Sequence, residues 1–236
     1  MIKILIIEDD TDINNLLARI MRRQGYEAVQ AFSGTEGKLR LELEQYDLLL
    51  LDLMLPGMMG EELIREIRKT DPDLPIIVLS AKSELDERVE VLKLGADDYM
   101  VKPFAAAEVE ARAAGALRRS TRCRKPEAAQ QESGNPLQLK KLQYKELTLD
   151  ADRREVRVRG QIMNLTAHEY DILYILLQEP GKVYSRERLY ELVWQGGYYG
   201  EDNTVNVHVS NLRKKIATAD TDEYIATVWG IGFRMA

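Results

Sequence analysis

The chain has 236 residues, of which 45% are hydrophobic and 31% are charged, and its formal net charge is −6 at pH 7. This composition is typical of a globular protein with one large domain or two ordinary ones. No apolar stretch is long enough to span a membrane, and an acidic triplet interrupts the first apolar run, so we expect a cytoplasmic protein with no membrane partner. A single cysteine excludes an internal disulfide and a cysteine-based zinc site.

The acidic residues are unevenly distributed along the chain. Residues 1–119 contain 23 acidic and 16 basic residues, whereas residues 138–236 contain 14 of each. Between them, residues 120–137 are polar, contain proline and glycine, and lack hydrophobic periodicity, which predicts a flexible linker between two domains. A neutral second domain can still carry a basic face that binds nucleic acid.

The first domain shows apolar strands alternating with helical patterns. Strands are predicted at about residues 3–7, 27–31, 47–51, 75–80 and 98–101. The first helical pattern places apolar side chains on one face, at Ile13, Leu16, Leu17, Ile20 and Met21. Alternating strands and helices predict an α/β fold, a doubly wound parallel sheet with helices on both faces.

The second domain begins with short alternating strands, such as residues 155–159, which end at Gly160. Helical stretches follow. Thr166 and Glu169 have the spacing of a capping box, Ser185 opens a short helix that ends near Trp194, and Asp202 can cap a helix running to about Ile216. Residues 224–235 are a hairpin candidate with Gly230 and Gly232 at the turn.

Polar side chains follow the predicted strands of the first domain. They are Glu8, Asp9 and Asp10 after the first strand, Asp52, Ser80, and Lys102. The carboxyl ends of parallel strands share one edge of the sheet, so these groups should converge there. Converging carboxylates repel one another unless a cation intervenes.

A hard divalent cation suits this set of ligands. Mg²⁺, or Mn²⁺, prefers oxygen ligands, and Asp9 and Asp52 would bind it directly while Glu8 acts through water. Lys102 and Ser80 would then contact a phosphoryl group accepted by an aspartate. The chain has no GxxxxGK[ST] loop for a nucleoside triphosphate. Taken singly, Asp52 could be a helix N-cap or a solvated strand end, Lys102 a surface lysine, and Tyr99 a residue of the core.

Residues 1–119 resemble the receiver domain of two-component response regulators. The resemblance rests on four motifs, in order Ile6-Ile7-Glu8-Asp9-Asp10, Leu51-Asp52-Leu53-Met54-Leu55-Pro56-Gly57, Val78-Leu79-Ser80-Ala81 and Gly95-Ala96-Asp97-Asp98-Tyr99-Met100-Val101-Lys102-Pro103-Phe104. It implies a flavodoxin-like (βα)5 fold and a sensor histidine kinase that phosphorylates Asp52. It also implies Mg²⁺ on Asp9, Asp52 and the main-chain oxygen of Met54, a cis Lys102–Pro103 bond, and Ser80 and Tyr99 as a switch pair.

In the OmpR/PhoB-type branch of this family, phosphorylation is implied to stabilise a homodimer through the fourth helix, fifth strand and fifth helix. The matching ion pairs across the two-fold axis would be Arg88 with Glu108, Asp97 with Arg119, and Asp98 with Arg112. Each exposed pair contributes only about 0–1 kcal/mol, so a symmetric network is needed. Solvated surface charges are the simpler alternative for any one pair.

The helix predicted at residues 202–216 has two distinct faces. On a helical wheel, Val205, Val209, Leu212 and Ile216 form a core stripe. The opposite face carries amides, a hydroxyl, an aliphatic group and a cation, with two further polar residues on its flanks: Asn203, Val207, Ser210, Asn211 and Lys214, then Asn206 and Arg213. Such a face suits the major groove of DNA, although an ordinary amphipathic helix would look similar.

Residues 138–236 resemble the winged-helix DNA-binding domain of OmpR/PhoB-type regulators. The resemblance is carried by Leu165-Thr166-Ala167-His168-Glu169-Tyr170, Val183-Tyr184-Ser185-Arg186-Glu187-Arg188-Leu189, the run from Asn203 to Ile216, and Ile225-Ala226-Thr227-Val228-Trp229-Gly230-Ile231-Gly232-Phe233. It implies that residues 202–216, including Thr204, read double-stranded promoter DNA, that the hairpin is a wing, and that residues 194–201 contact RNA polymerase.

The second domain departs from the family pattern at two positions. Trp229 stands in the wing where arginine is common, and Asn211 stands where many members keep a phosphate-binding arginine. Both changes remove positive charge, so DNA binding should depend less steeply on salt. We interpret His168 and His208 as packing or helix-surface residues, because no carboxylate or cysteine lies at metal-ligand spacing from either.

These patterns predict a phosphorylation-controlled transcription regulator rather than an enzyme, apart from self-phosphorylation and autodephosphorylation of Asp52. Two alternatives remain open. A magnesium-dependent phosphohydrolase would show multiple turnovers on phosphoesters. A constitutive DNA-binding protein with a scaffold receiver would bind its promoter equally well after Asp52→Asn.

Overall fold

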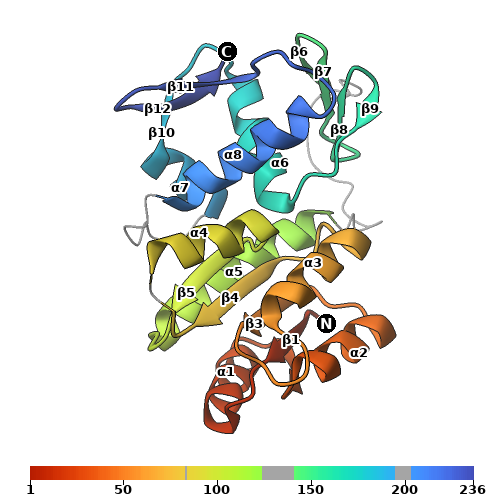
Figure 1. Ribbon diagram of the computed structural model, residues 1–236, viewed down its shortest axis with the longest axis vertical. Coiled ribbons are helices and arrows are strands. Elements are labelled where there is room, and N and C mark those ends of the chain that lie inside the picture. The colour runs from red at the N-terminus through yellow and green to blue at the C-terminus, as the bar shows by residue number, and fades with distance from the viewer. Residues whose placement is uncertain (83, 124–140, 195–202) are drawn as a thin grey trace, which may run out of the picture.

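The computed structural model describes residues 1–82, 84–123, 141–194 and 203–236, without the side chains of residues 119–123. The chain forms two domains, stacked one above the other in Figure 1. Helix α5 (Ala106–Cys123) continues past residue 119, where the sequence placed the end of the first domain. The rest of the predicted linker, from residue 124, lies outside the described residues.

The N-terminal domain is a parallel five-stranded sheet with the strand order β2-β1-β3-β4-β5. Its strands are β1 (Lys3–Ile7), β2 (Glu27–Ala31), β3 (Leu48–Asp52), β4 (Ile76–Ser80) and β5 (Asp98–Val101). The other helices are α1 (Thr11–Arg23), α2 (Gly34–Leu43), α3 (Gly60–Thr70) and α4 (Leu85–Leu94). This architecture confirms the predicted doubly wound α/β fold.

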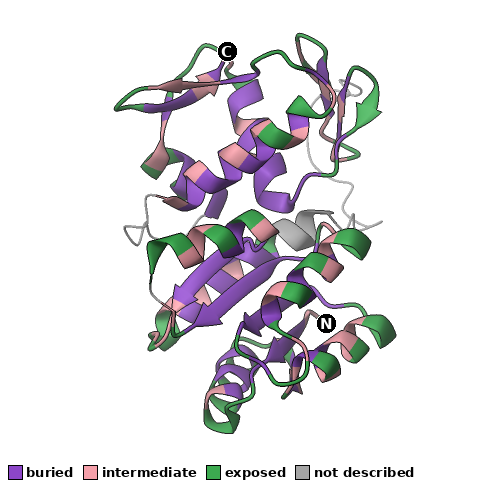
Figure 2. Cartoon of the chain, viewed as in Figure 1, coloured by how far each residue is buried: buried purple, intermediate pink, exposed green. Residues whose placement is uncertain are grey.

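Helices cover both faces of this sheet, so consecutive strand residues are buried on opposite sides. In β3, Leu49 and Leu51 join the cluster formed with α3 and α4, whereas Leu48 and Leu50 join the cluster formed with α1 and α5. Burial on both faces explains why the strands read as continuous apolar runs. Figure 2 shows the strands buried and the outer faces of α2 and α3 exposed.

The predicted apolar face of α1 is correct at Leu17, Ile20 and Met21, which are buried, but Leu16 is 43% exposed. One residue step turns an α-helix by about 100°, so Leu16 lies at the edge of the face centred on Leu17. Within the described residues, no helix is long and apolar enough to cross a membrane.

The C-terminal domain is a winged helix. A four-stranded antiparallel sheet comes first, with β6 (Lys141–Tyr144), β7 (Leu147–Asp150), β8 (Glu155–Val158) and β9 (Gln161–Ile162). Three helices follow, α6 (Ala167–Gln178), α7 (Arg186–Trp194) and α8 (Asn203–Ala217). A second sheet, in the order β10-β12-β11, contains β10 (Tyr184–Ser185), β11 (Ile225–Val228) and β12 (Gly232–Met235).

Local signals in this domain act as the sequence predicted. Thr166 Oγ1 accepts a hydrogen bond from the Glu169 N–H at 3.5 Å, and Glu169 Oε2 accepts one from the Thr166 N–H at 2.8 Å, which completes the capping box. Gly230 takes a φ of 72° in the turn between β11 and β12. Asp202, the predicted cap of α8, lies outside the described residues.

Candidate functional site

The predicted acidic pocket forms at the carboxyl edge of the parallel sheet. Strand register brings the ends of the strands together, because Ile7 pairs with Leu51, Asp52 with Leu79, and Ser80 with Val101. Glu8 follows β1, and Lys102 follows β5. The polar groups predicted from separate parts of the sequence therefore share one edge.

Carboxylates and a lysine meet in this pocket at short distances. Ligand atoms of Glu8, Asp9 and Asp52 lie within 4.8 Å of one another. The Lys102 ammonium donates to Glu8 Oε2 at 2.6 Å and to Asp52 Oδ2 at 2.5 Å. Glu8 and Asp52 are buried, whereas Asp9 is exposed. The cluster is thus open to solvent on the Asp9 side.

Burial and the short contacts between charged groups shift the pKa values of Glu8 and Lys102. Burial raises the pKa of Glu8 to about 7, although the hydrogen bond from Lys102 opposes the rise. Burial by itself would lower the pKa of Lys102, but hydrogen bonds to Asp52 and Glu8 raise it above its usual value. Lys102 is therefore a permanent cation, and Glu8 is the group whose charge responds to pH near neutrality.

Backbone contacts hold the pocket residues in place. The side-chain amide of Asn14 donates to the carbonyl oxygens of Glu8 and Ala31 at 2.8 and 2.9 Å. The Met54 N–H donates to Asp52 Oδ1 at 3.1 Å. Asp10 instead caps α1, where its carboxylate accepts from the backbone N–H of Asp12 at 2.9 Å. The acidic triplet thus divides between the pocket and a helix cap.

The oxygen ligands of this cluster fit a hard divalent cation. Its acidic groups are all carboxylates, and one of them faces solvent, where a metal can keep part of its water shell. Such a cation would screen the repulsion between Asp9 and Asp52, in addition to the contacts that Lys102 makes with Glu8 and Asp52. The receiver therefore has an acidic cluster consistent with a Mg²⁺ site.

The Lys102–Pro103 peptide bond is cis, as the resemblance implied. Ser80 is fully buried at the end of β4, and its hydroxyl accepts from the Lys82 N–H at 3.3 Å. The Tyr99 ring is 1% exposed, and its hydroxyl donates to the carbonyl oxygen of Lys82 at 2.7 Å. Ser80 and Tyr99 thus contact the same short segment after β4.

The residues predicted to pair across a dimer make contacts within this chain. Arg112 donates to both carboxylate oxygens of Asp98 at 2.7 Å and also to Glu108. Asp97 accepts from Arg68 at 2.7 Å. The Arg88 guanidinium lies 5.7 Å from the centre of the Tyr99 ring. The side chain of Arg119 is outside the described part of the chain.

The predicted DNA-reading residues of α8 are not uniformly exposed. Thr204, Val207 and Asn211 are buried, Lys214 is exposed, and the remaining positions are intermediate: Asn203, Asn206, Ser210 and Arg213. Arg213 also bonds to the carbonyl oxygen of Ile225. The expectation that Val207 and Asn211 face solvent is wrong for this arrangement, because α8 packs against the receiver. Trp229, by contrast, is 91% exposed in the wing.

Sequence reasoning did not identify His168 and His208 as interdomain contacts. The two rings lie 5.4 Å apart, both are 1% exposed, and both reach Asp97. The interpretation of His168 and His208 as packing residues is correct, because both side chains are buried. No local signal in the sequence marks the partner, since His168 and Asp97 are separated by 71 positions.

Family models match both halves of the chain. The response regulator receiver domain matches residues 4–114, and the C-terminal domain of transcriptional regulatory proteins matches residues 160–235. Residues 115–159, which include the predicted linker, lie outside both family models.

Curated relatives align with this chain over nearly its whole length. The chain is 38% identical to the transcriptional regulatory protein ResD of Bacillus subtilis, over 98% of this chain and 95% of ResD. It is 37% identical to the uncharacterized transcriptional regulatory protein YclJ of the same organism, over 98% of both chains. It is also 37% identical to SrrA of Staphylococcus aureus, over 98% of this chain and 94% of SrrA.

Among solved structures, a mutant of RitR superposes with a TM-score of 0.75 at 26% identity, covering 100% of this chain and 99% of that one. The OmpR/PhoB homolog DrrB of Thermotoga maritima gives 0.51 at 27% identity over the same shares. The comparisons place the chain in a family of transcription factors, and this family is not one of classical enzymes. The chain belongs to the OmpR/PhoB-type response regulators of two-component systems, and it is a DNA-binding transcriptional regulator.

Proposed function

We propose that this regulator accepts a phosphoryl group on Asp52 from a sensor histidine kinase, with Mg²⁺ or Mn²⁺ held by Asp9, Asp52 and the main-chain oxygen of Met54, and by Glu8 through water. The observation that carries the proposal is Lys102, which contacts both Asp52 and Glu8 beside the exposed carboxylate of Asp9. Both the kinase and the DNA would meet such a protein in the cytoplasm.

In the transfer step, a carboxylate oxygen of Asp52 attacks the phosphorus of the phosphohistidine. A P–O bond forms, the P–N bond breaks, and the imidazole nitrogen leaves with the electron pair. The cation would neutralise charge on the phosphoryl oxygens. Lys102 is already 2.5 Å from Asp52 and would move its ammonium contact to a phosphoryl oxygen. The Ser80 hydroxyl, at the end of the neighbouring strand, would donate to another.

Recruitment of Ser80 toward the phosphoryl group would change the contacts around Tyr99. In this proposal Ser80 and Tyr99 act as the switch pair, and the change favours a homodimer. Its interface would use α4, β5 and α5, with Arg88, Asp97, Asp98, Glu108, Arg112 and Arg119 as its charged residues. The added charge of the phosphoryl group would thereby favour the association of two receiver domains.

Paired winged helices would then bind promoter DNA. The direct readout would fall to α8 and the wing, through Asn203, Thr204, Asn206, Val207, Ser210, Asn211, Arg213, Lys214 and Trp229. An asparagine side chain can recognise adenine, and the Val207 side chain can touch a thymine methyl group. The segment 194–201, proposed to contact RNA polymerase, lies beyond the described residues except for Trp194.

The test is phosphorylation by acetyl phosphate with and without Mg²⁺, followed by intact-mass measurement. We expect one added phosphoryl group per chain that requires Mg²⁺ and is abolished by Asp52→Asn. Asp10→Asn is the matched control, because asparagine caps a helix as well as aspartate does. Phosphorylation that survives Asp52→Asn would refute Asp52 as the acceptor. Promoter affinity that Asp52→Asn leaves unchanged under phosphorylating conditions would favour the constitutive alternative.

A further inference from the structure

The two histidines of the chain lie together in the contact between its domains. His168 of α6 and His208 of α8 are buried, and their rings stack with their centres 5.4 Å apart. Both contact Asp97 of the receiver. The His168 Nδ1 atom lies 2.8 Å from the Asp97 carboxylate, and the His208 Nε2 atom lies 3.2 Å from the Asp97 carbonyl oxygen. Histidine is the side chain whose charge changes near neutral pH, so each contact must be examined in both charge states.

The contacts of His208 determine which of its nitrogen atoms carries the proton. A carbonyl oxygen can only accept a hydrogen bond, so the Nε2 atom of His208 donates to Asp97 and the neutral ring has its proton there. The Nδ1 atom is then an acceptor, and it has no hydrogen-bond partner among the described residues. A second proton would bind to Nδ1. It would create a buried N–H group on a charged ring, with nothing to accept its hydrogen bond.

Aromatic rings of α7 lie beside His208. The Trp194 ring is 5.4 Å from the His208 ring and inclined to it by 52°. Tyr190 stacks on Trp194 at 4.8 Å, and its hydroxyl accepts a hydrogen bond from Arg112 at 3.2 Å. A phenol is neutral near pH 7 and an indole does not titrate, so α7 places no negative charge against the His208 ring.

Three carboxylates are close enough to favour the charged form of His208, but each is already paired with a cation. The pairs are Asp97 with Arg68, Asp98 with Arg112, and Glu169 with Lys215, at 2.6–2.7 Å. Burial has a larger effect than these carboxylates, and it lowers the pKa of His208 below its ordinary value of 6.5. The pKa shift therefore agrees with the unfilled Nδ1 atom.

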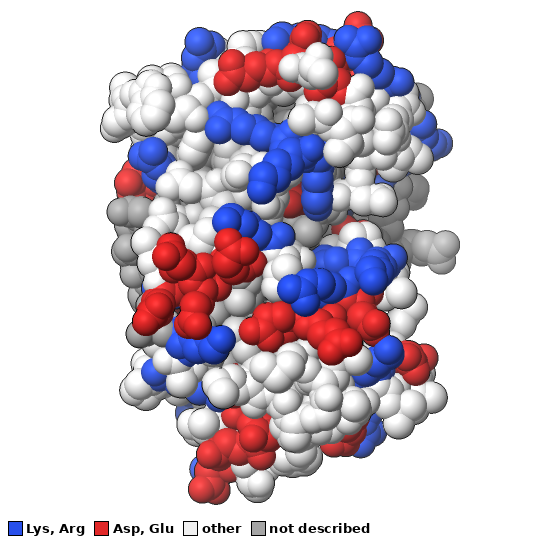
Figure 3. Space-filling model, in the orientation of Figure 1, with Lys and Arg blue, Asp and Glu red and all other residues white. Residues whose placement is uncertain are grey.

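Helix α4 also packs against α8 (Figure 1). Its apolar side chains Val91 and Leu92 cluster with Val207, the residue before His208. Figure 3 shows acidic side chains gathered over α4, below Lys and Arg side chains of the DNA-binding domain. The charged residues of α4 and of the last turn of α8 are Asp86, Glu87, Arg88, Glu90, Lys93, Lys214 and Lys215. Carboxylates in water titrate near pH 4, and Lys and Arg above pH 10, so surface charges of this kind stay constant between pH 5.5 and 7.5.

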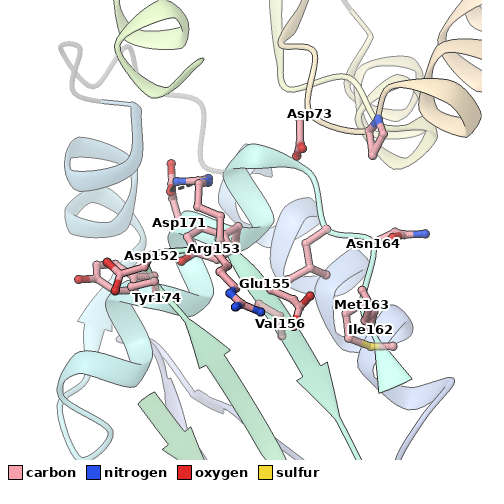
Figure 4. A pocket seen from close by; sticks show the side chains of 15 residues that line it. Asp73, Asp152, Arg153, Glu155, Val156, Ile162, Met163, Asn164, Asp171 and Tyr174 are labelled. Atoms are coloured by element: carbon pink, nitrogen blue, oxygen red, sulfur yellow. Dashed lines mark hydrogen bonds and ion pairs between the residues drawn. The ribbon is translucent and has the colours of Figure 1, made fainter. Parts of the chain in front are cut away.

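Two other titratable groups at the boundary respond to acid in the opposite direction. Asp73 lies across a cavity of about 660 Å³ from Asp152 and Tyr174 of the DNA-binding domain (Figure 4). Partial burial raises the pKa of Asp73, so a proton on Asp73 favours the arrangement that buries it. His168 faces the Asp97 carboxylate, so a proton on His168 strengthens their attraction. Burial opposes the charge of Asp97, but Arg68 and His168 hold its pKa below its ordinary value.

From this geometry we propose that His208 makes the contact between the two domains sensitive to acid. The domains separate more readily when His208 takes up a proton from solvent at Nδ1, because only the separated arrangement lets water solvate the charged ring. His208 is the group that takes up this proton, rather than His168 or Asp73. Acid thereby uncovers Val207 and its neighbours on α8. This response goes beyond the proposed function, since it requires neither a phosphoryl group nor DNA.

The size of the effect follows from the uptake of one proton. A histidine in water has a pKa of about 6.5, and the buried His208 ring binds its proton only at lower pH. A lowered pKa in the contact means that the contact is most stable above about pH 6.5 and loses stability as the pH falls below it. For one proton, the separated fraction should rise about tenfold between pH 7.5 and pH 5.5.

The first test observes the histidine rings directly. In full-length protein labelled with ¹⁵N at histidine, the ring signals come from only two residues, and His168→Asn identifies those of His168 by their loss. We expect His208 to carry its proton on Nε2 at pH 7.5 and to titrate below pH 6.5. A proton on Nδ1 of the neutral ring, or titration of His208 at or above pH 6.5, would overturn the proposal.

The second test measures separation of the domains by thiol chemistry, in a Cys123→Ser background that removes the natural cysteine. Val207→Cys places a thiol against α4, and Ile231→Cys places one on the wing, where the native side chain is 56% exposed. The ratio of their rates with dithiodipyridine corrects for the effect of pH on the reagent. We expect this ratio to rise about tenfold from pH 7.5 to pH 5.5, with unchanged circular dichroism. A ratio that stays constant would refute the proposal.

Variants of the titratable groups assign the proton. His208→Gln keeps an amide donor near the Asp97 carbonyl oxygen but cannot be charged, so the rate ratio should lose its dependence on pH. His168→Asn is the matched control, because its amide can replace the Nδ1 donor, and it should retain the tenfold rise. Asp73→Asn should also retain it. A rise that survives His208→Gln, or that disappears in either control, would assign the proton to another group and refute the proposal.

Discussion

Replacing Lys102 with methionine removes the cation that bridges Glu8 and Asp52. Methionine keeps much of the aliphatic volume, so the main loss is electrostatic. Breaking a buried ion pair on one side costs about 3–5 kcal/mol. This pocket is open beside Asp9 and the Lys102 side chain is 14% exposed, so water reduces the penalty, and we expect a loss of about 2 kcal/mol.

The stability lost in Lys102→Met should increase as pH rises. The pKa of Glu8 is raised to about 7 in the folded protein, above its value of about 4.3 in an unfolded chain. Without Lys102 it rises further. A group with a raised folded pKa favours folding at low pH and loses that contribution as pH increases. The variant should therefore be most destabilised at pH 8–9 and should recover as pH falls below about 7.

The assay is urea unfolding followed by circular dichroism at pH 8.5 and pH 6, with and without Mg²⁺. At pH 8.5 the midpoint should fall by about 1 M urea, and millimolar Mg²⁺ should restore most of it because a divalent cation replaces the lost charge. Lys82→Met is the control, because Lys82 makes only a half-exposed pair with Glu87 at 3.3 Å. A loss of equal size at both pH values and insensitive to Mg²⁺ would refute the electrostatic reasoning.

Two further substitutions test packing. Leu212→Ala, at a fully buried position of α8, should destabilise the DNA-binding domain by about 2–5 kcal/mol in urea unfolding, whereas Ile162→Ala, at a 50% exposed position, should change it by less than about 1 kcal/mol. Gly60→Ala would place a Cβ 2.6 Å from the carbonyl oxygen of Asp52, so it should cost about 1–3 kcal/mol and weaken Mg²⁺ binding measured by calorimetry. Gly181→Ala meets no atom within 4 Å and should leave Mg²⁺ binding unchanged.

The sequence was sufficient to predict the receiver pocket because each of its residues ends a strand or follows one. A strand must deliver its last side chain to the edge of the sheet, so the convergence of Asp52 and Lys102 follows from the order of elements alone. The same logic predicted the helix starts at Thr166 and Ser185, where the polar side chain and the turn it caps are neighbours in the sequence.

The contacts between the domains could not be predicted in this way. The amphipathic pattern of α8 predicts a solvent-exposed reading face, because it shows only the face that packs inside the helix's own domain. Val207 instead completes the core of the other domain. Pairs such as Asn211 with Leu92 depend on how two separately folded units are oriented, and hydrophobic periodicity carries no information about that orientation.

The pocket residues and the residue that contacts the other domain lie at different strands of the receiver sheet. The carboxylates of the pocket lie at the ends of the inner strands β1 and β3, whereas Asp97, which contacts His168 and His208 of the other domain, precedes the edge strand β5. A chimera that joined this receiver to the output domain of another regulator would keep its chemistry intact. An output domain without histidines at these two positions would, however, lack the contacts that His168 and His208 make with Asp97.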